Sequence, residues 1–179
     1  MSYFIGIPIN LKEIPIKLTE PYYKIPEDQL HITLIYIGSL KEREVNTVRR
    51  ILNEVASGHK AFKIMLHGII LLPSSIKPRY LALSVTKGTE RLSELRNEIL
   101  TKLTDAKISL RDAYLNEFKP HITFARTKAK PSDIPQKLIK KLMRIGKGFK
   151  EEVEVRGVIL YEASRGVYKV ISKHKLLAP

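Results

Sequence analysis

The chain has 179 residues, of which 44% are hydrophobic and 28% charged, so it has the size and composition of a single folded domain with an ordinary core. It contains no cysteine, which excludes disulfides, thiolate metal sites and a cysteine nucleophile. The 32 Lys and Arg residues against 18 Asp and Glu residues give a formal net charge of +14, which favours a polyanionic partner such as nucleic acid over a merely solvated basic surface.

The first elements along the chain are two predicted strands separated by a broken segment. Tyr3-Phe-Ile-Gly-Ile-Pro8 has the continuous apolar pattern of a buried strand. Residues 10–30 contain Pro15 and Pro21, which interrupt any helix there. A second strand carries His31-Ile-Thr-Leu34.

A helix and a third strand are predicted next. Ser39 is the candidate N-cap of the helix, Glu42 lies three residues later, and Gly58 closes it. Its apolar stripe consists of Val45, Val48, Leu52 and Val55. The strand is Lys63–Leu71, and the Pro73–Pro78 stretch after it is the predicted crossing between two lobes.

The second half of the chain begins in the same way. A buried strand is predicted at Tyr80–Val85, and His121-Ile-Thr-Phe124 is the strand that corresponds to the one at His31. The segment between them predicts a helix whose apolar side is formed by Leu92, Leu95, Ile99 and Leu103.

The remaining elements complete the correspondence. A helix is predicted with Asp133 as its N-cap, Gln136 three residues later and Gly146 at its end. Its apolar stripe consists of Leu138, Leu142 and Ile145. Two strands follow, at Glu152–Leu160 and Val167–Leu176.

These elements form an internal repeat around two HIT motifs that begin at His31 and His121. Gly68 and Gly157 occupy matching places in the strands that follow. We therefore expect an α+β fold with one bilobal domain over residues 1–179, built from approximate repeat units 1–72 and 78–176. Two small, pseudo-symmetric antiparallel β-sheets should face each other across a cleft, with the helices outside.

Each HIT motif places a histidine and a threonine on one face of its strand. Because strand side chains alternate, His31 and Thr33 share a face, and so do His121 and Thr123. Opening a cyclic phosphodiester requires that a proton be removed from water and that a proton be delivered to the departing ribose oxygen. A neutral histidine can do the first and a protonated histidine the second. The threonine hydroxyls can hold phosphate oxygens, so the chemistry requires neither a metal nor a cofactor. Which histidine is the acid stays open; the working assignment gives that role to His31.

Four segments in order, Pro26–Gly38, Pro78–Leu83, Phe118–Arg126 and Val158–Glu162, carry a resemblance to a known family. The chain resembles the 2H phosphoesterase superfamily, defined by two HxT motifs in two lobes, and within it the RNA 2′,3′-cyclic phosphodiesterases (2′-5′ RNA ligase-like proteins). The resemblance implies hydrolysis of 2′,3′-cyclic phosphate to a 2′-phosphate, with some reverse 2′-5′ joining. It also implies that His31, Thr33, His121 and Thr123 form the catalytic set.

Two further residues are candidates for substrate binding. The resemblance implies that Arg126 holds the phosphate, but strict alternation puts Arg126 on the face opposite His121. Either the strand ends or bulges before Arg126, or this arginine is structural. Tyr36, which lies beyond Thr33 on its strand, is expected to line the cleft.

The other histidines and the basic segment have simpler interpretations. His59, His67 and His174 lack metal-ligand spacing, so we expect surface or packing roles and no metal site. Residues 128–150 are rich in Lys and Arg; they form either the solvated side of a helix or a field that guides RNA. Arg79 and Tyr80 can approach a base or a phosphate.

The expected partners are RNA with 2′,3′-cyclic phosphate ends, tRNA fragments among them, or small cyclic nucleotides. We expect a cytoplasmic protein, because the sequence has no signal peptide and no apolar run long enough to span a bilayer. We expect a monomer, because the sequence shows no obvious interface stripe. Two alternatives stay open: a non-catalytic RNA-binding module, and a 2H enzyme acting on another cyclic or 2′-5′ linked nucleotide.

Overall fold

The computed structural model describes residues 1–11, 14, 16–111 and 117–179, so the expected helix breaker Pro15 lies outside the described residues. Two short 3₁₀ turns occur at Glu27–Gln29 and Pro131–Asp133. The helices are α1 (Glu42–Ala56), α2 (Thr89–Asp105) and α3 (Gln136–Gly148). The strands are β1 (Ser2–Pro8), β2 (Tyr23–Lys24), β3 (His31–Gly38), β4 (Phe62–Pro73), β5 (Pro78–Lys87), β6 (His121–Arg126), β7 (Lys150–Val155), β8 (Gly157–Ser164) and β9 (Val167–Lys175).

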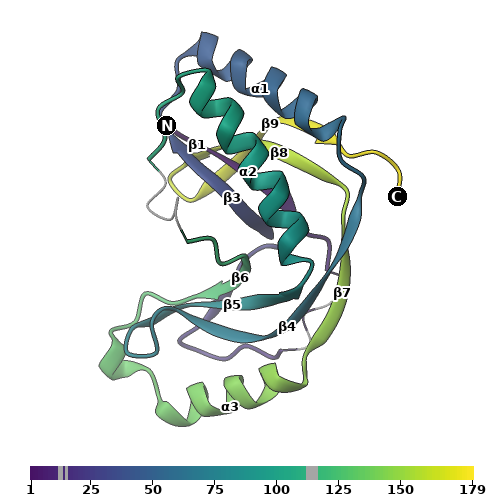
Figure 1. Ribbon diagram of the computed structural model, residues 1–179. Helices are drawn as coiled ribbons and strands as arrows, with labels where there is room; N and C mark the ends of the chain where they lie inside the picture. Colours follow the sequence, from purple (N-terminus) through teal and green to yellow (C-terminus); the bar gives the residue numbers. More distant parts are fainter. Residues whose placement is uncertain (12–13, 15, 112–116) are drawn as a thin grey trace.

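The strand order is symmetric about the joint between β6 and β3, which fits the repeat in the sequence. The strands run β7-β4-β5-β6-β3-β1-β8-β9, and β2 pairs with the edge of β6. Matching β3 with β6 also matches β1 with β5, β8 with β4 and β9 with β7. Helices α1 and α2 cover one half of the sheet and α3 covers the other half (Figure 1). The expected α+β class with pseudo-symmetric halves and outer helices is therefore confirmed.

The two halves are not separate sheets. They join where β3 meets β6, through the single antiparallel pair of Ile32 with Ile122. Each repeat also exchanges a strand with the other: β4 pairs with β5, and β8 pairs with β1. The sequence cannot anticipate this exchange, because pairing partners so far apart along the chain leave no local pattern.

The predicted crossing at Pro73–Pro78 is wrong. These two prolines are paired residues at the end of the β4–β5 hairpin, within one half of the molecule. The chain instead crosses between halves after α1, on its way to β4, and again at Arg156, where the predicted strand Glu152–Leu160 divides. Its first part, β7, pairs with β4, and its second part, β8, pairs with β1 and β9.

The helices begin later than their predicted caps. α1 is capped at Lys41, whose backbone N–H donates to Glu44 Oε1 at 2.9 Å, rather than at Ser39. Asp133 belongs to the separate 3₁₀ turn, and Pro135 precedes α3 instead. A proline suits this place because the first residues of a helix need no intrahelical N–H donor.

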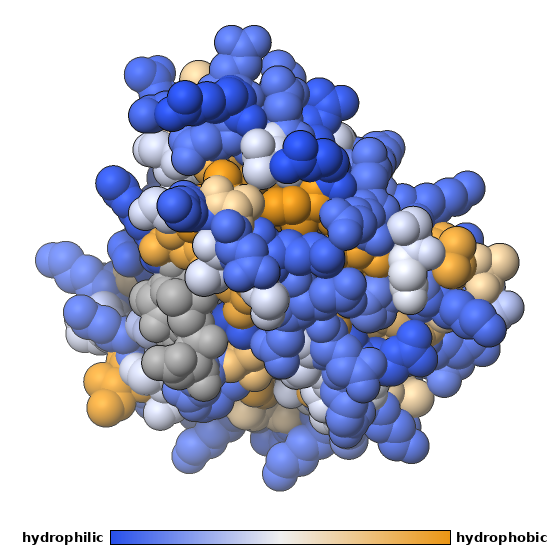
Figure 2. All heavy atoms as spheres, turned by 45° about the horizontal axis from the view of Figure 1, so that its top comes forward, coloured by the Kyte–Doolittle hydropathy of each residue, from blue (hydrophilic) through white to orange (hydrophobic). Residues whose placement is uncertain are grey.

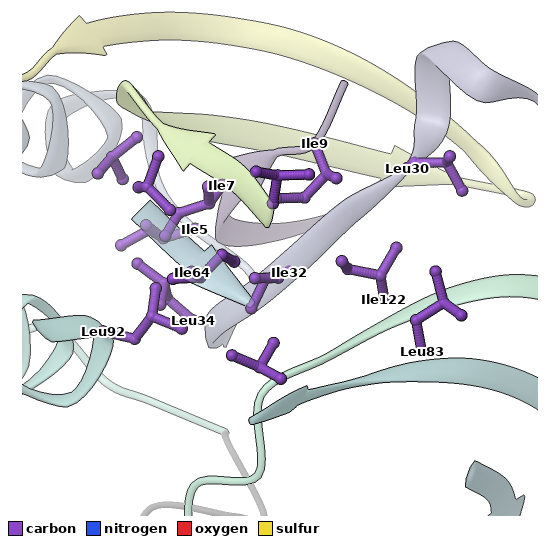
Figure 3. Packing of buried hydrophobic residues seen from close by; sticks show 14 of the residues in the cluster. Ile5, Ile7, Ile9, Leu30, Ile32, Leu34, Ile64, Leu83, Leu92 and Ile122 are labelled. Carbon is purple, nitrogen blue, oxygen red and sulfur yellow. The ribbon is translucent and has the colours of Figure 1, made fainter. Parts of the chain in front are cut away.

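The core is built from the predicted apolar stripes. Four leucine and isoleucine side chains of α2 are fully buried: Leu92, Leu95, Ile99 and Leu103. In the close view of the core, Ile32 and Ile122 lie at the joint between the halves, and Leu34 faces Leu92 (Figure 3). The face seen in Figure 2 is mostly hydrophilic, with apolar side chains in small separate areas. Among the described residues, no helix has the length and apolar character needed to cross a membrane.

Gly146 lies inside α3 rather than at its end, because the helix presses closely on β4. A Cβ atom at Gly146 would lie 2.7 Å from Ile69 Cγ1 and 2.9 Å from the Ile69 backbone nitrogen. We predict that Gly146→Ala lowers the free energy of unfolding by about 1–3 kcal/mol, as overpacking does. Urea denaturation measures the change. Gly148→Ala is the matched control, since nothing lies within 4 Å of the added methyl group; equal stabilities for both variants would contradict the close packing.

Candidate active site

The pairing of β3 with β6 brings the two HIT motifs together at the centre of the sheet. Ile32 and Ile122 form the antiparallel pair and are fully buried on the core face. The neighbouring side chains therefore point to the opposite face. In this register His31 lies opposite Thr123, and Thr33 lies opposite His121. The four predicted catalytic residues thus share one surface.

A β-bulge at the same place in both strands extends this surface. In β3, Thr33 pairs with Gly6 and Ile35 pairs with Ile5, which leaves Leu34 as the extra residue. In β6, Thr123 pairs with Ala82 and Ala125 pairs with Leu81, which leaves Phe124 extra. An extra residue reverses the alternation of every side chain that follows it.

The bulges resolve the conflict over Arg126. Arg126 pairs with Tyr80, whose side chain shares a face of β5 with Ala82, the partner of Thr123. Arg126 is therefore on the face of His121, and its guanidinium carbon lies 5.2 Å from the centre of the Tyr23 ring. A Cβ atom at Gly166, in the β8–β9 turn of the other half, would lie 4.0 Å from Arg126 Nη1. The arginine therefore reaches across the site surface.

Tyr36 corresponds to Arg126 in the other repeat. Each lies five residues after its histidine. Tyr36 pairs with Phe4, which shares a face of β1 with Gly6, the partner of Thr33. Its side chain is 39% exposed, so it is accessible to a ligand on the site surface. Substrate binding by Tyr36 and Arg126 stays a prediction.

Both histidines are oriented by the same backbone contact. Nδ1 of His31 lies 2.8 Å from the carbonyl oxygen of Gln29, and Nδ1 of His121 lies 2.8 Å from that of Lys119. A carbonyl oxygen only accepts hydrogen bonds, so Nδ1 carries the proton in both neutral imidazoles. The Nε2 atoms are thereby left to exchange protons. In His31, Nε2 lies 3.1 Å from Thr33 Oγ1, whose hydroxyl can donate to it.

Three aromatic rings enclose His31. The centres of the Phe4, Tyr161 and Tyr168 rings lie 5.0, 5.7 and 5.3 Å from the centre of the imidazole. Burial among them lowers the pKa of His31 below its usual value of 6.5; the Gln29 carbonyl opposes this, and positive charge on His121 adds to it. Burial also raises the pKa of Tyr161 to about 12, so its hydroxyl keeps its proton.

Gly6 is a small residue that the aromatic enclosure requires. A Cβ atom there would lie 3.0 Å from the Ile32 carbonyl oxygen and 3.2 Å from the Tyr161 ring. The predicted strands covered Phe4, Gly6 and Tyr168 and ended one residue before Tyr161, but no spacing in the sequence connects these residues with His31. Their role around the histidine was therefore missed.

Arg96 is a second residue that sequence reasoning missed. It is only 3% exposed, and its Nε donates to the carbonyl oxygen of the bulged residue Leu34 at 2.9 Å. Its guanidinium carbon lies 4.9 Å from the centre of the Phe118 ring, just before the second HIT motif. Arg96 thus supports both motif strands. A signal was present, since Arg96 lies between Leu92 and Ile99 on the apolar side of α2.

The remaining histidines make structural contacts outside this surface. His59 pairs with Glu98 between α1 and α2, and His67 Nε2 lies 3.0 Å from the Lys147 carbonyl oxygen. His174 is buried, with its ring nitrogens hydrogen-bonded to Asn53 and Ser172. Within the described part of the chain, no three His, Asp or Glu side chains converge as a metal site would require.

Comparison with known proteins finds one family across most of the chain. The sequence profile of the 2′-5′ RNA ligase superfamily matches residues 15–166. An RNA 2′,3′-cyclic phosphodiesterase of Aquifex aeolicus is 25% identical over 153 residues, which cover 86% of this chain and 78% of the relative. One of Thermotoga maritima is 28% identical over 148 residues, covering 78% and 76%.

Solved structures share the fold over nearly the whole length. The crystal structure of a Thermus thermophilus protein superimposes with a TM-score of 0.70 at 23% identity and covers 99% of both chains. Escherichia coli LigT in complex with 3′-AMP gives a TM-score of 0.68 at 19% identity, covering 98% of this chain and 97% of LigT. At these identities the likeness shows a common fold.

Proposed function

Because this chain belongs to the 2′-5′ RNA ligase superfamily of 2H phosphoesterases, we propose that it hydrolyses 2′,3′-cyclic phosphates on RNA ends or nucleotides to 2′-phosphates by two-histidine acid–base catalysis. One observation carries the proposal: both HIT motifs present their histidine and threonine on one surface, with both imidazoles held in the same tautomer. The names of the Aquifex and Thermotoga relatives support the substrate.

His31 acts as the base. Its lowered pKa keeps Nε2 unprotonated at neutral pH, so Nε2 can take a proton from the attacking water. The working assignment of the acid to His31 does not fit this environment, because aromatic burial disfavours the imidazolium. The acid is then His121, whose ring has no aromatic neighbour among the described residues.

The reaction breaks one bond and forms one. The water oxygen bonds to phosphorus while the bond from phosphorus to the ribose O3′ breaks. His31 Nε2 receives the water proton, and His121 Nε2 gives its proton to O3′, which leaves the phosphate on O2′. The charge that grows on the phosphate oxygens is held by the hydroxyls of Thr33 and Thr123 and by the Arg126 guanidinium. Neither a metal nor a cofactor takes part. With the 5′-hydroxyl of a second RNA in place of water, the same proton transfers open the cyclic phosphate into a 2′-5′ phosphodiester as the bond to O3′ breaks.

The pH dependence of hydrolysis tests these roles. With 2′,3′-cyclic AMP as substrate, kcat/KM should follow a bell-shaped curve, because one histidine must be neutral and the other protonated. His31 loses its proton at a lower pH than an ordinary histidine, so the rising limb should be centred below pH 6.5. A flat profile from about pH 5 to 9 would exclude the histidine pair.

Removing part of the aromatic enclosure should move that limb. Tyr168→Ala exposes the imidazole of His31, so its pKa rises and the rising limb shifts to higher pH. Tyr168→Phe keeps the ring and should leave the limb near its wild-type position. The two profiles are measured side by side at constant ionic strength; a limb unmoved in Tyr168→Ala would remove His31 as the base.

A further inference from the structure

A basic hollow lies at the outer end of β6, beyond the site surface. It has a volume of about 280 Å³ and is lined by the prolines and aliphatic side chains of the β4–β5 turn and of residues 128–134. Four cationic residues border it: Lys77, Arg79, Lys128 and Lys130. All four are exposed, whereas Pro78 and Ile134 in its wall are buried.

These four cations have no acidic partners among the described residues. The ion pairs of that part of the chain involve other lysines and arginines, such as Lys102 with Glu54 and Arg156 with Glu154. Four unpaired positive charges around one hollow repel each other and favour a polyanion. The whole chain carries a net charge of +14, and these four residues concentrate part of that positive charge in one place.

Hydrogen bonds hold the walls of the hollow in place. The backbone N–H of Thr127 donates to the Arg79 carbonyl at 3.0 Å, which ties the end of β6 to β5. Thr127 is 3% exposed, and its hydroxyl accepts from the N–H of Ala129 at 3.1 Å. The hollow is therefore largely formed before any ligand arrives.

The hollow continues the line of the proposed active site. At roughly 3.3 Å per residue, β6 covers about 16 Å from His121 to Arg126, and the cationic border begins two residues later. The larger hollow next to His31 has the opposite character. It has a volume of about 550 Å³, adjoins Leu30 and is lined by five acidic residues and Arg156. Three of the acids, Glu27, Glu152 and Glu154, pair with Lys24, Lys63 and Arg156, which leaves Asp28 and Glu151 as the acids for which no ion pair is seen among the described residues. The charge difference between the two hollows therefore favours the basic hollow for a polyanion that leaves the histidines.

We propose that this hollow binds the phosphate backbone of the RNA several nucleotides upstream of the cyclic end, which makes oligonucleotides rather than mononucleotides the preferred substrates. The inference rests on the proposed function for the position of the cyclic end. With about 3.4 Å per stacked nucleotide, about five nucleotides span the distance from His121 to Arg126 and about seven reach Lys128. The prolines of the lining and Ile134 give the bases an apolar floor.

The first experiment varies substrate length. RNAs of two to twelve nucleotides ending in a 2′,3′-cyclic phosphate are compared with 2′,3′-cyclic AMP. The KM of the wild type should fall about tenfold once the RNA reaches the hollow and then level off, because each added phosphate contact strengthens binding until the cations are used. A KM that does not change with length would overturn the proposal while leaving the cyclic phosphodiesterase intact.

The second experiment removes two of the cations. Lys128→Ala/Lys130→Ala should raise the KM of the twelve-nucleotide substrate about five- to tenfold and reduce the slope of log Kd against log salt by about 1.4, or about 0.7 for each lost contact. The matched control is Lys140→Ala/Lys141→Ala, which removes the same charge from the exposed side of α3. Equal effects of the two double variants would mean that the net positive charge of the protein attracts RNA without a specific binding site at the hollow, which would overturn the proposal.

Binding is also measured without turnover, so that the two proposals can fail separately. Fluorescence anisotropy with a twelve-nucleotide RNA carrying a 2′-phosphate reports Kd for the wild type and for both double variants. Weaker binding only in Lys128→Ala/Lys130→Ala supports the hollow even if no cyclic phosphate is hydrolysed. Equal Kd values for all three proteins would overturn it. Lys128→Arg/Lys130→Arg retains the charges and should restore binding.

Discussion

Alanine in place of His31 or His121 is expected to lower kcat for 2′,3′-cyclic AMP by about 10²- to 10⁴-fold, the usual contribution of a positioned acid or base. The loss should appear in kcat more than in KM, because Nε2 acts on protons that move only in the transition state. Steady-state rates of each variant beside the wild type measure it.

The double variant and a third histidine provide the controls. His31→Ala/His121→Ala should be little worse than either single variant, since an acid without its base already loses most of the benefit. His67→Ala removes an exposed histidine whose ring is hydrogen-bonded to the Lys147 carbonyl, away from the HIT motifs, and should retain full activity. Near-normal kcat in either single variant would rule out the two-histidine mechanism.

Arg96→Met should be the most damaging substitution away from the site surface. Losing the donor to the Leu34 carbonyl should cost about 1–3 kcal/mol of the free energy of unfolding, the penalty of a buried unpaired group. The bulge at Leu34 sets the direction of Tyr36, so KM for the cyclic substrate should also rise in the protein that remains folded. Urea denaturation and steady-state kinetics measure the two effects.

Two variants distinguish positioning from plain stability. Arg91→Met, on the exposed side of the same helix, removes a cation lying 5.0 Å from the Phe62 ring and should alter neither KM nor kcat. Arg96→Lys retains the charge and should recover part of the stability but not the bulge geometry, because lysine lacks the Nε donor. If Arg96→Met is destabilised but has wild-type KM and kcat well below its melting temperature, Arg96 stabilises the fold without positioning the site.

Much of the fold could be predicted because its signals are local. The alternating and helical apolar patterns located the strands and the stripes of α1, α2 and α3. The repeated HIT motif supplied the symmetry that the sheet order displays about Ile32 and Ile122. The surface shared by His31, Thr33, His121 and Thr123 follows from strand alternation combined with that symmetry.

The remaining features depend on contacts that leave no local pattern. The bulges at Leu34 and Phe124 depend on register with neighbouring strands, and so does the face of Arg126. The aromatic enclosure of His31 joins residues from β1, β8 and β9. The prolines and serines of Pro73–Pro78 mark a turn without saying which strands it joins, whereas the crossing at Arg156 lies inside a continuous strand pattern, so only the strand pairing locates it. The predicted starts of α1 and α3 were wrong because several residues near each start could serve as the cap, and the sequence alone does not choose among them.

Phosphorus NMR of an RNA ending in a 2′,3′-cyclic phosphate, incubated with the wild-type protein in excess EDTA, tests the central claim most directly. The account predicts that the cyclic resonance is replaced by that of a 2′-phosphomonoester, and that His31→Ala and His121→Ala leave it unchanged. A 3′-phosphate product, a reaction that needs an added divalent ion, or no conversion by the wild type would contradict it.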